Sequence, residues 1–331
     1  MDIFKNKTIL ITGGTGSFGN YFVNFLLKNT KSKKIIIYSR DEFKQYNMKN
    51  SIHSKYHEKL RFFIGDVRDI SRLEFATNEV DILIHSAAMK QVEASEYNPI
   101  ECIKTNITGT ENVIKACISS KISKAVLVST DKAVNPINLY GSTKLASEKI
   151  FLNANNLVGK NDLRFSVVRY GNVAGSRGSV IPFFLNLIKN GKTQFPITDN
   201  KMTRFWISLD EAAKFVKMSI ENMNGGEIFV PKLYSFYVKD LPKVLHPKPK
   251  IKIIGKRIGE KLAEVMISKE ESENTVEYKN YYKVLTNENY LSKERNKRNS
   301  MVVKKIFEYD SATNTKKLNL INLRKKILSD L

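Results

Sequence analysis

The sequence predicts an α/β protein built on a doubly wound parallel sheet. Short apolar runs alternate five times with segments of helical periodicity, and a glycine-rich turn follows the first run. Beyond about residue 175 this alternation becomes irregular. We therefore expect a large sheet domain over residues 1–175 and a smaller second domain mainly over 176–331, with part of the chain recrossing to the first domain.

The composition limits the classes of protein to which the chain can belong. It has 331 residues, a formal charge of +22 and no apolar run of 18 residues, so we expect no membrane span. Its basic residues are scattered rather than gathered on one element with aromatic side chains, which argues against nucleic-acid binding. The N-terminus leads straight into an apolar run without a signal-peptide pattern, so the expected location is the cytoplasm.

The cysteines and histidines do not indicate a metal site. Cys102 and Cys117 lack a C-x-x-C spacing, so we expect small apolar residues on helix faces rather than a disulfide framework or a zinc site. His53 and His57 lie four apart on a polar stretch, which is more typical of a solvated helix face than of a metal pair. His85 lies inside an apolar run and is interpreted as a strand residue rather than a catalyst.

The first strand is expected over Lys7 to Thr12, and glycines follow it at once. The glycine pattern satisfies G-x-G-x-x-G, and Phe18 to Lys28 then has helical spacing. Glycine allows the tight turn and lets the backbone approach a pyrophosphate at the helix N-terminus. The strand, turn and helix together predict a dinucleotide site of the Rossmann type. The expected cofactor contacts here are Thr12, Gly13, Gly16, Ser17, Phe18 and Gly19.

The end of the second strand indicates which dinucleotide is bound. The strand covers Lys34 to Tyr38 and ends in Ser39, Arg40 and Asp41. An acidic residue at this strand end usually contacts the ribose 2′-hydroxyl of NAD. Here Ser39 and Arg40 suit a 2′-phosphate instead, with Asp41 beside them and Lys44 one turn further on. We therefore predict NADP, although Arg40 also fits an ordinary surface arginine.

Four further strands place polar and small residues at the same sheet edge. They are expected over Arg61–Ile64, Val80–His85, Ala125–Ser129 and Phe165–Arg169. The carboxyl ends of parallel strands meet at one edge, where ligands bind. The expected cofactor contacts from these strand ends and the helix after the fourth strand are Asp66, Val67, Ala87, Ala88, Lys90 and Asn106.

Two groups of reactive side chains follow the fifth strand. Thr130, Asp131 and Lys132 stand at the strand end, and a Tyr-x-x-x-Lys pair opens a helix expected over Tyr140 to Leu152. Tyr140 and Lys144 are spaced i, i+4, so both project from one helix face. We expect the positive charges of Lys144 and an oxidised nicotinamide to lower the pKa of Tyr140, which then takes the proton of an alcohol. The triplet supplies an additional acid and base.

Beyond residue 175, arginines stand beside glycines or aromatic residues in three places. These are the segments 175–179, 202–206 and 256–261. Planar guanidinium groups suit phosphates and aromatic rings suit nucleobases, so the three clusters together favour a phosphorylated substrate. The final 60 residues are rich in charge, with a short amphipathic helix expected near Leu318 to Leu331.

These motifs resemble those of the extended short-chain dehydrogenases/reductases, and closely those of the inverting UDP-N-acetylglucosamine 4,6-dehydratases of pseudaminic acid biosynthesis. The similarity covers nearly the whole chain, from Thr12–Gly19 through Ser129–Lys144 to the Arg257-x-Gly-Glu260-Lys261 block. It implies a bound NADP that is regenerated in each turnover, UDP-N-acetylglucosamine as substrate, and a homo-oligomer, either a hexamer or a dimer. The implied substrate contacts are Lys90, Thr130, Asn172, Val173, Arg177, Thr203, Arg204, Arg257 and Glu260.

The triplet separates members of this superfamily. The resembling 4-epimerases carry small residues at the positions of Asp131 and Lys132, whereas removal of water from carbons 5 and 6 needs an added base and acid. Deoxythymidine diphosphate-glucose dehydratases have Thr-Asp-Glu, so Lys132 replaces a glutamate. A lysine made neutral by burial could serve as the base. The resemblance thus implies catalysis by Thr130, Asp131, Lys132, Tyr140 and Lys144.

Some positions depart from the family pattern. Gln91 and Glu93 stand beside Val92 where close relatives have histidine and proline, and Ile258 replaces a proline. The local substrate pocket can differ for this reason. The alternatives are a retaining 4,6-dehydratase, a nucleotide-sugar 4-epimerase and a non-catalytic NADP-sensing regulator. Retaining, membrane-anchored relatives typically have methionine in place of Tyr140, so the sequence favours the inverting class.

Overall fold

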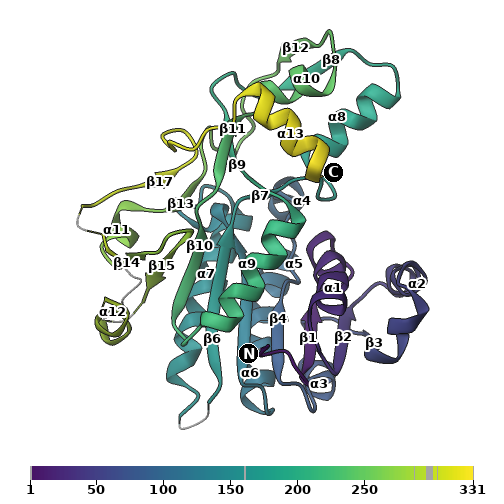
Figure 1. The fold of residues 1–331 in the computed structure, drawn as a ribbon, viewed down its shortest axis with the longest axis vertical. Helices are drawn as coiled ribbons and strands as arrows, with labels where there is room; N and C mark the ends of the chain where they lie inside the picture. The colour runs from purple at the N-terminus through teal and green to yellow at the C-terminus, as the bar shows by residue number, and fades with distance from the viewer. Residues whose placement is uncertain (1, 160–161, 287, 296–300, 304, 331) are drawn as a thin grey trace.

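The computed structural model describes residues 2–159, 162–286, 288–295, 301–303 and 305–330. Within these residues a ten-stranded sheet has the order β16-β14-β15-β10-β6-β5-β4-β1-β2-β3 (Figure 1). Its strands are β1 (Thr8–Thr12), β2 (Lys34–Ser39), β3 (Leu60–Ile64), β4 (Ile82–His85), β5 (Lys124–Thr130), β6 (Arg164–Tyr170), β10 (Glu227–Pro231), β14 (Thr275–Glu277), β15 (Tyr281–Leu285) and β16 (Met301–Val302).

The seven strands from β3 to β10 are parallel, and β15, β14 and β16 extend the sheet in antiparallel pairs. Strands covered on both faces need apolar side chains throughout, and β1 (Thr8–Thr12) and β10 (Glu227–Pro231) are buried at every position. The order β3-β2-β1-β4-β5-β6 is that of a doubly wound Rossmann sheet, as expected.

Helices cover both faces of this sheet (Figure 1). On one face α1 (Ser17–Asn29) packs against α9 (Leu209–Asn222). On the other, α3 (Ile70–Ala76), α6 (Gly109–Ile118) and α7 (Leu139–Asn153) pack in series. The remaining elements around the sheet are α2 (Glu42–Ser51), η1 (Ser54–Lys59), α4 (Val92–Tyr97), α5 (Pro99–Ile103), the π-helical turn η2 (Lys104–Thr108), η3 (Asp131–Ala133) and η4 (Ala154–Asn156).

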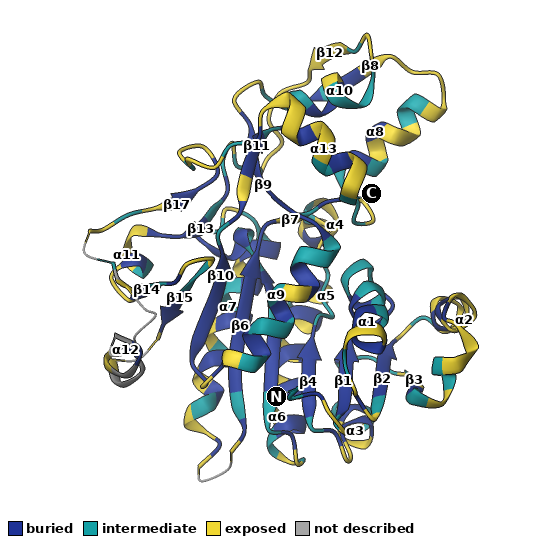
Figure 2. Ribbon diagram, in the orientation of Figure 1, coloured by how far each residue is buried: buried dark blue, intermediate teal, exposed yellow. Residues whose placement is uncertain are grey.

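A second, smaller core lies beyond the carboxyl edge of the sheet, at the top of Figure 1. It is built around Phe184, Phe195, Trp206 and Leu323. Its elements are β7 (Asn172–Val173), α8 (Val180–Lys189), β8 (Gln194–Ile197), β9 (Thr203–Ile207), β11 (Tyr234–Tyr237), α10 (Asp240–Leu245), β12 (Lys250–Ile253) and α13 (Leu320–Asp330). Figure 2 shows that α8 and α13 keep exposed faces, whereas the central strands are buried.

The chain after residue 175 contributes to both cores. Strand β10 belongs to the large sheet and helix α9 covers it, while β13 (Val265–Ile267) pairs with β17 (Tyr309–Asp310) and their buried residues join the large core. The segments α11 (Lys269–Ser272) and α12 (Glu288–Arg295) lie beside the antiparallel strands β14 and β15 of the large sheet (Figure 1). The domain boundary at residue 175 stays a prediction.

The expected strands and helices agree with the described elements within two residues at each boundary, except that Leu331 lies outside the described residues. Local capping explains several helix starts. The Asp41 side chain accepts a hydrogen bond from the Lys44 backbone at α2, and Asn138 accepts one from Gly141 at α7. In the described part of the chain, no helix is both long enough and apolar enough to cross a membrane.

Candidate active site

A cavity of about 1030 Å³ lies at the carboxyl ends of the parallel strands. It extends from the glycine turn after β1 to the segment that precedes β13. Most predicted site residues line it: Gly13, Gly16, Ser17, Phe18, Gly19, Ser39, Arg40, Asp41, Lys44, Asp66, Val67, Ala87, Ala88, Lys90, Thr130, Asp131, Lys132, Tyr140, Lys144, Asn172, Val173, Arg177, Arg204, Arg257 and Glu260. One cavity therefore unites residues from the glycine turn, the triplet and the arginine clusters.

The glycine turn brings its backbone close to the neighbouring loop. Gly13 has a positive φ of 65°, and a Cβ there would lie 2.8 Å from the Ala87 Cα. A Cβ on Gly19 would lie 2.6 Å from the Gly14 Cα, so larger residues would separate α1 from the turn. The N-terminus of α1 opens onto the cavity, where backbone N–H groups suit a pyrophosphate.

Two predicted cofactor contacts, Thr12 and Asn106, do not line the cavity, and we correct these expectations. The Thr12 hydroxyl lies 2.7 Å from His85 Nδ1 and accepts a hydrogen bond from the Ser86 backbone. The Asn106 side chain hydrogen-bonds both the N–H and the carbonyl of Met89, at 2.8 and 3.0 Å. Both residues are buried behind the loop after β4 and hold its backbone in place.

The predicted substrate contact Thr203 is also wrong in this arrangement. Thr203 is fully buried in β9 and its hydroxyl lies 2.8 Å from the Ser311 hydroxyl. The neighbouring Arg204 does line the cavity and donates to the carbonyls of Thr203 and Lys261. Alternate residues of a strand face opposite sides, so these two neighbours cannot both face the cavity.

The basic residues expected near phosphates come from separate parts of the chain. Lys90 Nζ donates to the Arg177 carbonyl at 3.0 Å, and the Arg177 guanidinium donates to the Thr15 carbonyl. The Arg177 backbone N–H donates to the Ser17 hydroxyl at 3.1 Å. The segment after β7 is thus tied across the glycine turn.

At the end of β2, Arg40 extends into a mostly exposed position beside Asp66. Its Nη1 lies 3.6 Å from Asp66 Oδ2, while Lys44 pairs with Asp41 at 2.6 Å. Asp66 also pairs at 2.7 Å with Arg68, a residue that the sequence analysis did not single out. Burial alone would raise the pKa of Asp66, but Arg68 and Arg40 outweigh it and lower that pKa. Asp66 is therefore kept ionised.

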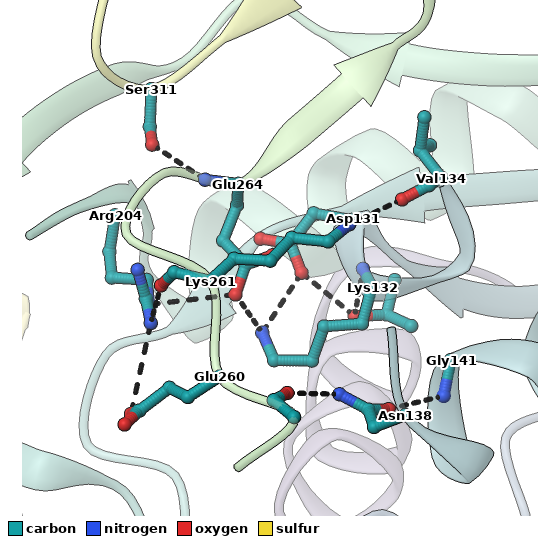
Figure 3. Close-up of polar contacts among 12 residues, drawn as sticks. Asp131, Lys132, Val134, Asn138, Gly141, Arg204, Glu260, Lys261, Glu264 and Ser311 are labelled. Atoms are coloured by element: carbon teal, nitrogen blue, oxygen red, sulfur yellow. Dashed lines mark hydrogen bonds and ion pairs between the residues drawn. The ribbon is translucent and has the colours of Figure 1, made fainter. Parts of the chain in front are cut away.

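Asp131 and Lys132 occupy the short turn η3, directly after β5 (Figure 3). Lys132 Nζ lies 3.1 Å from Asp131 Oδ1 and 3.0 Å from Glu264 Oε1. The Thr130 hydroxyl donates to the same Asp131 oxygen at 3.0 Å. Asp131 and Glu264 are almost completely buried, so one ammonium group is shared by two carboxylates inside the protein.

The expectation that burial makes Lys132 neutral is wrong for this arrangement. Burial lowers the pKa of Lys132, but the charges of Asp131 and Glu264 outweigh it and raise that pKa above its ordinary value. Burial raises the pKa of Asp131, because the opposing effect of Lys132 is smaller and Glu264 adds a second negative charge. Lys132 thus carries a proton, and Asp131 is unusually ready to take one.

Tyr140 and Lys144 lie on the buried face of α7, as their spacing predicts. Burial raises the pKa of Tyr140 to about 12, opposed by the positive charge of Lys132 and the Thr130 side chain. Burial lowers the pKa of Lys144 to about 8, and Lys144 Nζ donates to the Val128 carbonyl at 3.0 Å. The expected lowering of the Tyr140 pKa by Lys144 is therefore not seen, and Lys132 is the lysine that acts on it.

The 256–261 segment closes one side of the cavity. Arg257 Nη1 pairs with Glu93 Oε1 at 2.9 Å, and the Asn138 side chain donates to the Gly259 carbonyl at 2.8 Å. Both partners of this ion pair are largely exposed. Ile258, one of the departures from the family pattern, is fully exposed.

Sequence reasoning missed Glu264 and did not assign a role to Lys261. Lys261 Nζ donates to the Val134 carbonyl at 2.6 Å and lines the cavity with Glu264. Glu264 follows the Arg257 cluster closely in the sequence, but no spacing rule links it to Lys132. As expected, His85 is a buried strand residue, and both cysteines are buried in helices. Among the described residues no cluster of metal ligands occurs.

The doubly wound sheet, glycine turn and Tyr-Lys pair define an extended short-chain dehydrogenase/reductase of the NAD(P)-dependent kind. The family described as "Polysaccharide biosynthesis protein" matches residues 9–286, and the chain belongs to this family. A curated relative from Campylobacter jejuni strain 81-176, "UDP-N-acetylglucosamine 4,6-dehydratase (inverting)", is 56% identical over 85% of this chain and 84% of its own length.

Other relatives extend over nearly the whole chain. "UDP-glucose 4-epimerase" from Rickettsia rickettsii is 39% identical over 99% of this chain and 97% of its own length. Among solved structures, Pen from Bacillus thuringiensis has a TM-score of 0.90 and 34% identity, covering 99% of this chain and 98% of Pen. DesIV from Streptomyces venezuelae, described as a dTDP-glucose 4,6-dehydratase, has a TM-score of 0.67 and 21% identity, covering 77% and 86%, and supports the fold alone.

Proposed function

We propose that this protein is a UDP-N-acetylglucosamine 4,6-dehydratase that inverts the configuration at carbon 5. The observation that carries the proposal is the Asp131–Lys132 pair, which lines the same cavity as Tyr140 and the glycine turn. An enzyme that only oxidises and reduces carbon 4 has no need for this second acid–base pair. The 56% identity to the inverting dehydratase from Campylobacter jejuni supports the same substrate and outcome.

The cofactor cradle fits a dinucleotide, because glycine backbone, the N-terminus of α1 and the end of β2 border one continuous cavity. When bound, NADP accepts a hydride from carbon 4 and returns it to carbon 6. Arg40 and Lys44 line this cavity at and just after the end of β2, and their positive charges support NADP over NAD. The glycine turn would receive the pyrophosphate, and the loop after β4 would border the nicotinamide.

Tyr140 takes the proton of the 4-hydroxyl group as that carbon is oxidised. In the protein alone its pKa is about 12, so the phenol is neutral near neutral pH. The positive charge of an oxidised nicotinamide beside it would favour the phenolate. Tyr140 therefore becomes a base when the oxidised cofactor is bound, which links proton removal to hydride transfer.

Elimination of water then uses the proton that Asp131 and Lys132 share. Transfer of this proton along their 3.1 Å hydrogen bond leaves a neutral Lys132 amine and a protonated Asp131. The amine removes the proton from carbon 5, which the 4-ketone has acidified, and Asp131 protonates the departing 6-hydroxyl group to give water. The pair thereby returns to an ammonium and a carboxylate. A bound, reduced cofactor would supply the hydride for carbon 6, and a solvent-derived proton would add to the opposite face of carbon 5.

Other side chains in the cavity are suited to the nucleotide-sugar. Lys90, Arg177, Arg204 and Arg257 supply positive charge from different elements, as two phosphates require. Asn172, Val173 and Glu260 line the same space and complete the proposed substrate contacts. Thr130 holds Asp131 through its hydroxyl.

We further propose that the protein works in the cytoplasm as a homo-oligomer, either a hexamer or a dimer. Exposed apolar side chains on α8 and α13, namely Phe183, Leu185, Ile321 and Leu328, support contacts of these helices with another copy of the chain. Sedimentation equilibrium at several protein concentrations gives the mass of the assembly. A mass equal to one 37.9 kDa chain at every concentration would contradict this part of the proposal.

The test is incubation of the purified protein with UDP-N-acetylglucosamine and NADP in deuterated water, followed by proton NMR. A dehydratase produces a new carbon 6 methyl signal and replaces the carbon 5 proton with deuterium. The second candidate is a 4-epimerase, which the 39% identity to the Rickettsia rickettsii protein favours. Its product would keep the carbon 6 hydroxyl and show only an altered carbon 4 configuration. A carbon 6 methyl product with retained carbon 5 configuration would instead identify a retaining dehydratase, and absence of any turnover would contradict all three.

A further inference from the structure

Glu264 reaches the reactive centre from a distant part of the chain. It directly precedes β13 and lines the cavity opposite η3 (Figure 3). Only 2% of its side chain is exposed, and its Oε1 lies 3.0 Å from Lys132 Nζ and 3.6 Å from Arg204 Nε. A carboxylate so deeply buried is costly unless positive partners compensate it. The contacts of Glu264 with Lys132 and Arg204 therefore compensate its burial and fix the carboxylate in the cavity wall.

The hydrogen bonds of this cluster are incomplete in a particular way. Lys132 contacts one oxygen of Asp131 and one oxygen of Glu264. Among the described residues, the second oxygens, Asp131 Oδ2 and Glu264 Oε2, have no hydrogen-bond partner although both are buried. Buried polar atoms are normally satisfied, and exceptions occur at sites that exchange protons or contact ligands. The two carboxylates thus keep acceptor capacity beside the cavity.

The backbone of Glu264 is fixed on the side away from Lys132. Its N–H donates to the Ser311 hydroxyl and its carbonyl accepts from the Ser311 N–H, both at 2.9 Å. The Thr203 hydroxyl lies 2.8 Å from the same Ser311 hydroxyl, and β13 pairs with β17 next to this point. Three separate segments therefore set where the Glu264 carboxylate stands.

We propose that Glu264 is a positioning residue for dehydration, which orients the Lys132 side chain and keeps a proton on it until Asp131 takes that proton. This inference rests on the proposed function. With Glu264 in place, the Asp131–Lys132 pair holds a single proton over the working pH range. That proton moves from Lys132 Nζ to Asp131 Oδ1 and leaves the base and the acid that elimination needs. Glu264 itself neither gains nor loses a proton.

The charges that face Lys132 agree with this role. The negative charges near Lys132 are those of Asp131 on η3 and Glu264 before β13. The neutral Tyr140 hydroxyl approaches Lys132 from α7. Positive charge comes from Arg204 on β9 and from Lys261, and both act on Glu264 as well. Burial would raise the pKa of Glu264, but Lys132 and Arg204 outweigh it and lower that pKa, so Glu264 stays ionised, whereas the pKa of Asp131 is raised. Glu264, whose negative charge is better balanced by nearby positive charges than that of Asp131, is thus the carboxylate that positions Lys132.

The test is the pH dependence of carbon 5 deuterium exchange and of methyl product formation in Glu264→Gln. Loss of one negative charge near Lys132 lowers both apparent pKa values of the Asp131–Lys132 pair. Both limbs of the pH–rate profile should therefore move to lower pH, by about 1 unit or more. Glu264→Asp keeps the charge and should restore the wild-type limbs even if the rate is lower. Glu111→Gln removes an exposed carboxylate on α6 that pairs with Lys115 at 2.6 Å and does not line the cavity, so this control should leave the limbs in place.

A lower rate at every pH with unmoved limbs would overturn the inference, because a purely structural role predicts that result. Should Glu264→Gln not fold, as judged by circular dichroism, Ser311→Ala loosens Glu264 without touching Lys132. A shift of both limbs in the same direction is then expected, and unmoved limbs overturn the inference. If the wild-type protein forms no methyl product, the proposed function fails instead, so the two failures are distinguishable.

Discussion

The hydrogen bond between Lys132 and Asp131 joins two groups whose ordinary pKa values differ by several units. In water, a proton in such a pair stays on the amine. Here full burial and the charge of Glu264 raise the pKa of Asp131, so this carboxylate accepts a proton more readily than it would in water, while Asp131 and Glu264 together raise the pKa of Lys132. The pair can therefore act as base and acid in a single step, as the proposed elimination requires.

Lys132→Ala tests this assignment at the residue scale. Carbon 5 exchange with deuterium should fall at least about a hundredfold, because the base is lost. Oxidation of carbon 4 depends on Tyr140 and should continue, so the absorbance of reduced cofactor should build up after substrate is added. Lys192→Ala, on an exposed residue outside the cavity, is the control and should behave as wild type. A variant that exchanges the carbon 5 proton at the normal rate would remove Lys132 from the mechanism.

Arg40 tests the choice of cofactor. Its guanidinium lies at the end of β2 beside Asp66 and is mostly exposed. Loss of a charge-assisted contact to a 2′-phosphate costs about 1.5–3 kcal/mol. Arg40→Ala should therefore raise the Kd for NADP about tenfold or more, while the Kd for NAD changes little. Calorimetric titration of both dinucleotides measures this, with Arg61→Ala on β3 as control. Equal losses for NAD and NADP would contradict a 2′-phosphate contact.

At the scale of elements, the site depends on how α7 packs against η3. Both elements carry residues of the proposed mechanism, Tyr140 on α7 and Lys132 on η3, so the distance between the elements sets the geometry of the site. Gly141 makes the close approach possible, because a Cβ there would lie 2.3 Å from the Lys132 carbonyl oxygen. The Asn138 cap fixes the start of α7, and its amide also hydrogen-bonds Gly259 in the segment opposite.

Gly141→Ala should separate these two elements. The added methyl group meets backbone rather than a flexible side chain, so we expect a loss of about 1–3 kcal/mol in the free energy of unfolding. Dehydration should slow more than carbon 4 oxidation, because Lys132 moves relative to the sugar. Urea unfolding and the two activities measure these effects. Ser142→Ala, on the exposed face of the same helix turn, should stay within about 0.5 kcal/mol of wild type. Equal stability of the two variants would show that the close approach of Gly141 to the Lys132 carbonyl does not require glycine.

At the scale of the whole molecule, stability at low pH depends on a histidine inside the sheet. His85 is fully buried on β4 between the hydroxyls of Thr12 and Thr110, at 2.7 and 3.1 Å. Burial lowers its pKa to about 3, so the folded protein holds this imidazole neutral. The unfolded chain binds a proton there below about pH 6.5, and the folded chain does not. Stability is therefore lost as the pH falls between these two values.

Below about pH 6.5, His85 should reduce the free energy of unfolding by about 1.4 kcal/mol for each pH unit of acidification. Between pH 7.5 and pH 5 this amounts to about 2 kcal/mol, because the loss begins only near pH 6.5. His85→Gln should lose less stability over this range than the wild-type protein. Urea unfolding at the two pH values measures the difference, with the exposed His53→Gln as control. If His85→Gln and wild type lose the same free energy on acidification, the imidazole is not responsible.

Local patterns in the sequence were sufficient for the sheet and the cofactor turn. Buried parallel strands need continuous apolar residues, and the turn after β1 needs glycine, so each feature produces a sequence pattern within a few neighbouring positions. The spacing of Tyr140 and Lys144 likewise follows from the helical period alone. Because residues at parallel strand ends share one edge, these features also predicted that most of the site residues would meet.

What the sequence by itself determined is therefore the α/β fold and its glycine turn, and it proposed the triplet and the Tyr-Lys pair as reactive residues. Only the tertiary structure decided their partners and protonation. Glu264 reaches Lys132 because β13 pairs with β17, and Thr12, Asn106 and Thr203 turn away from the cavity to support it. The physical reason is that pKa values and buried ion pairs depend on charges a few ångströms away in space, whereas sequence patterns record neighbours along the chain.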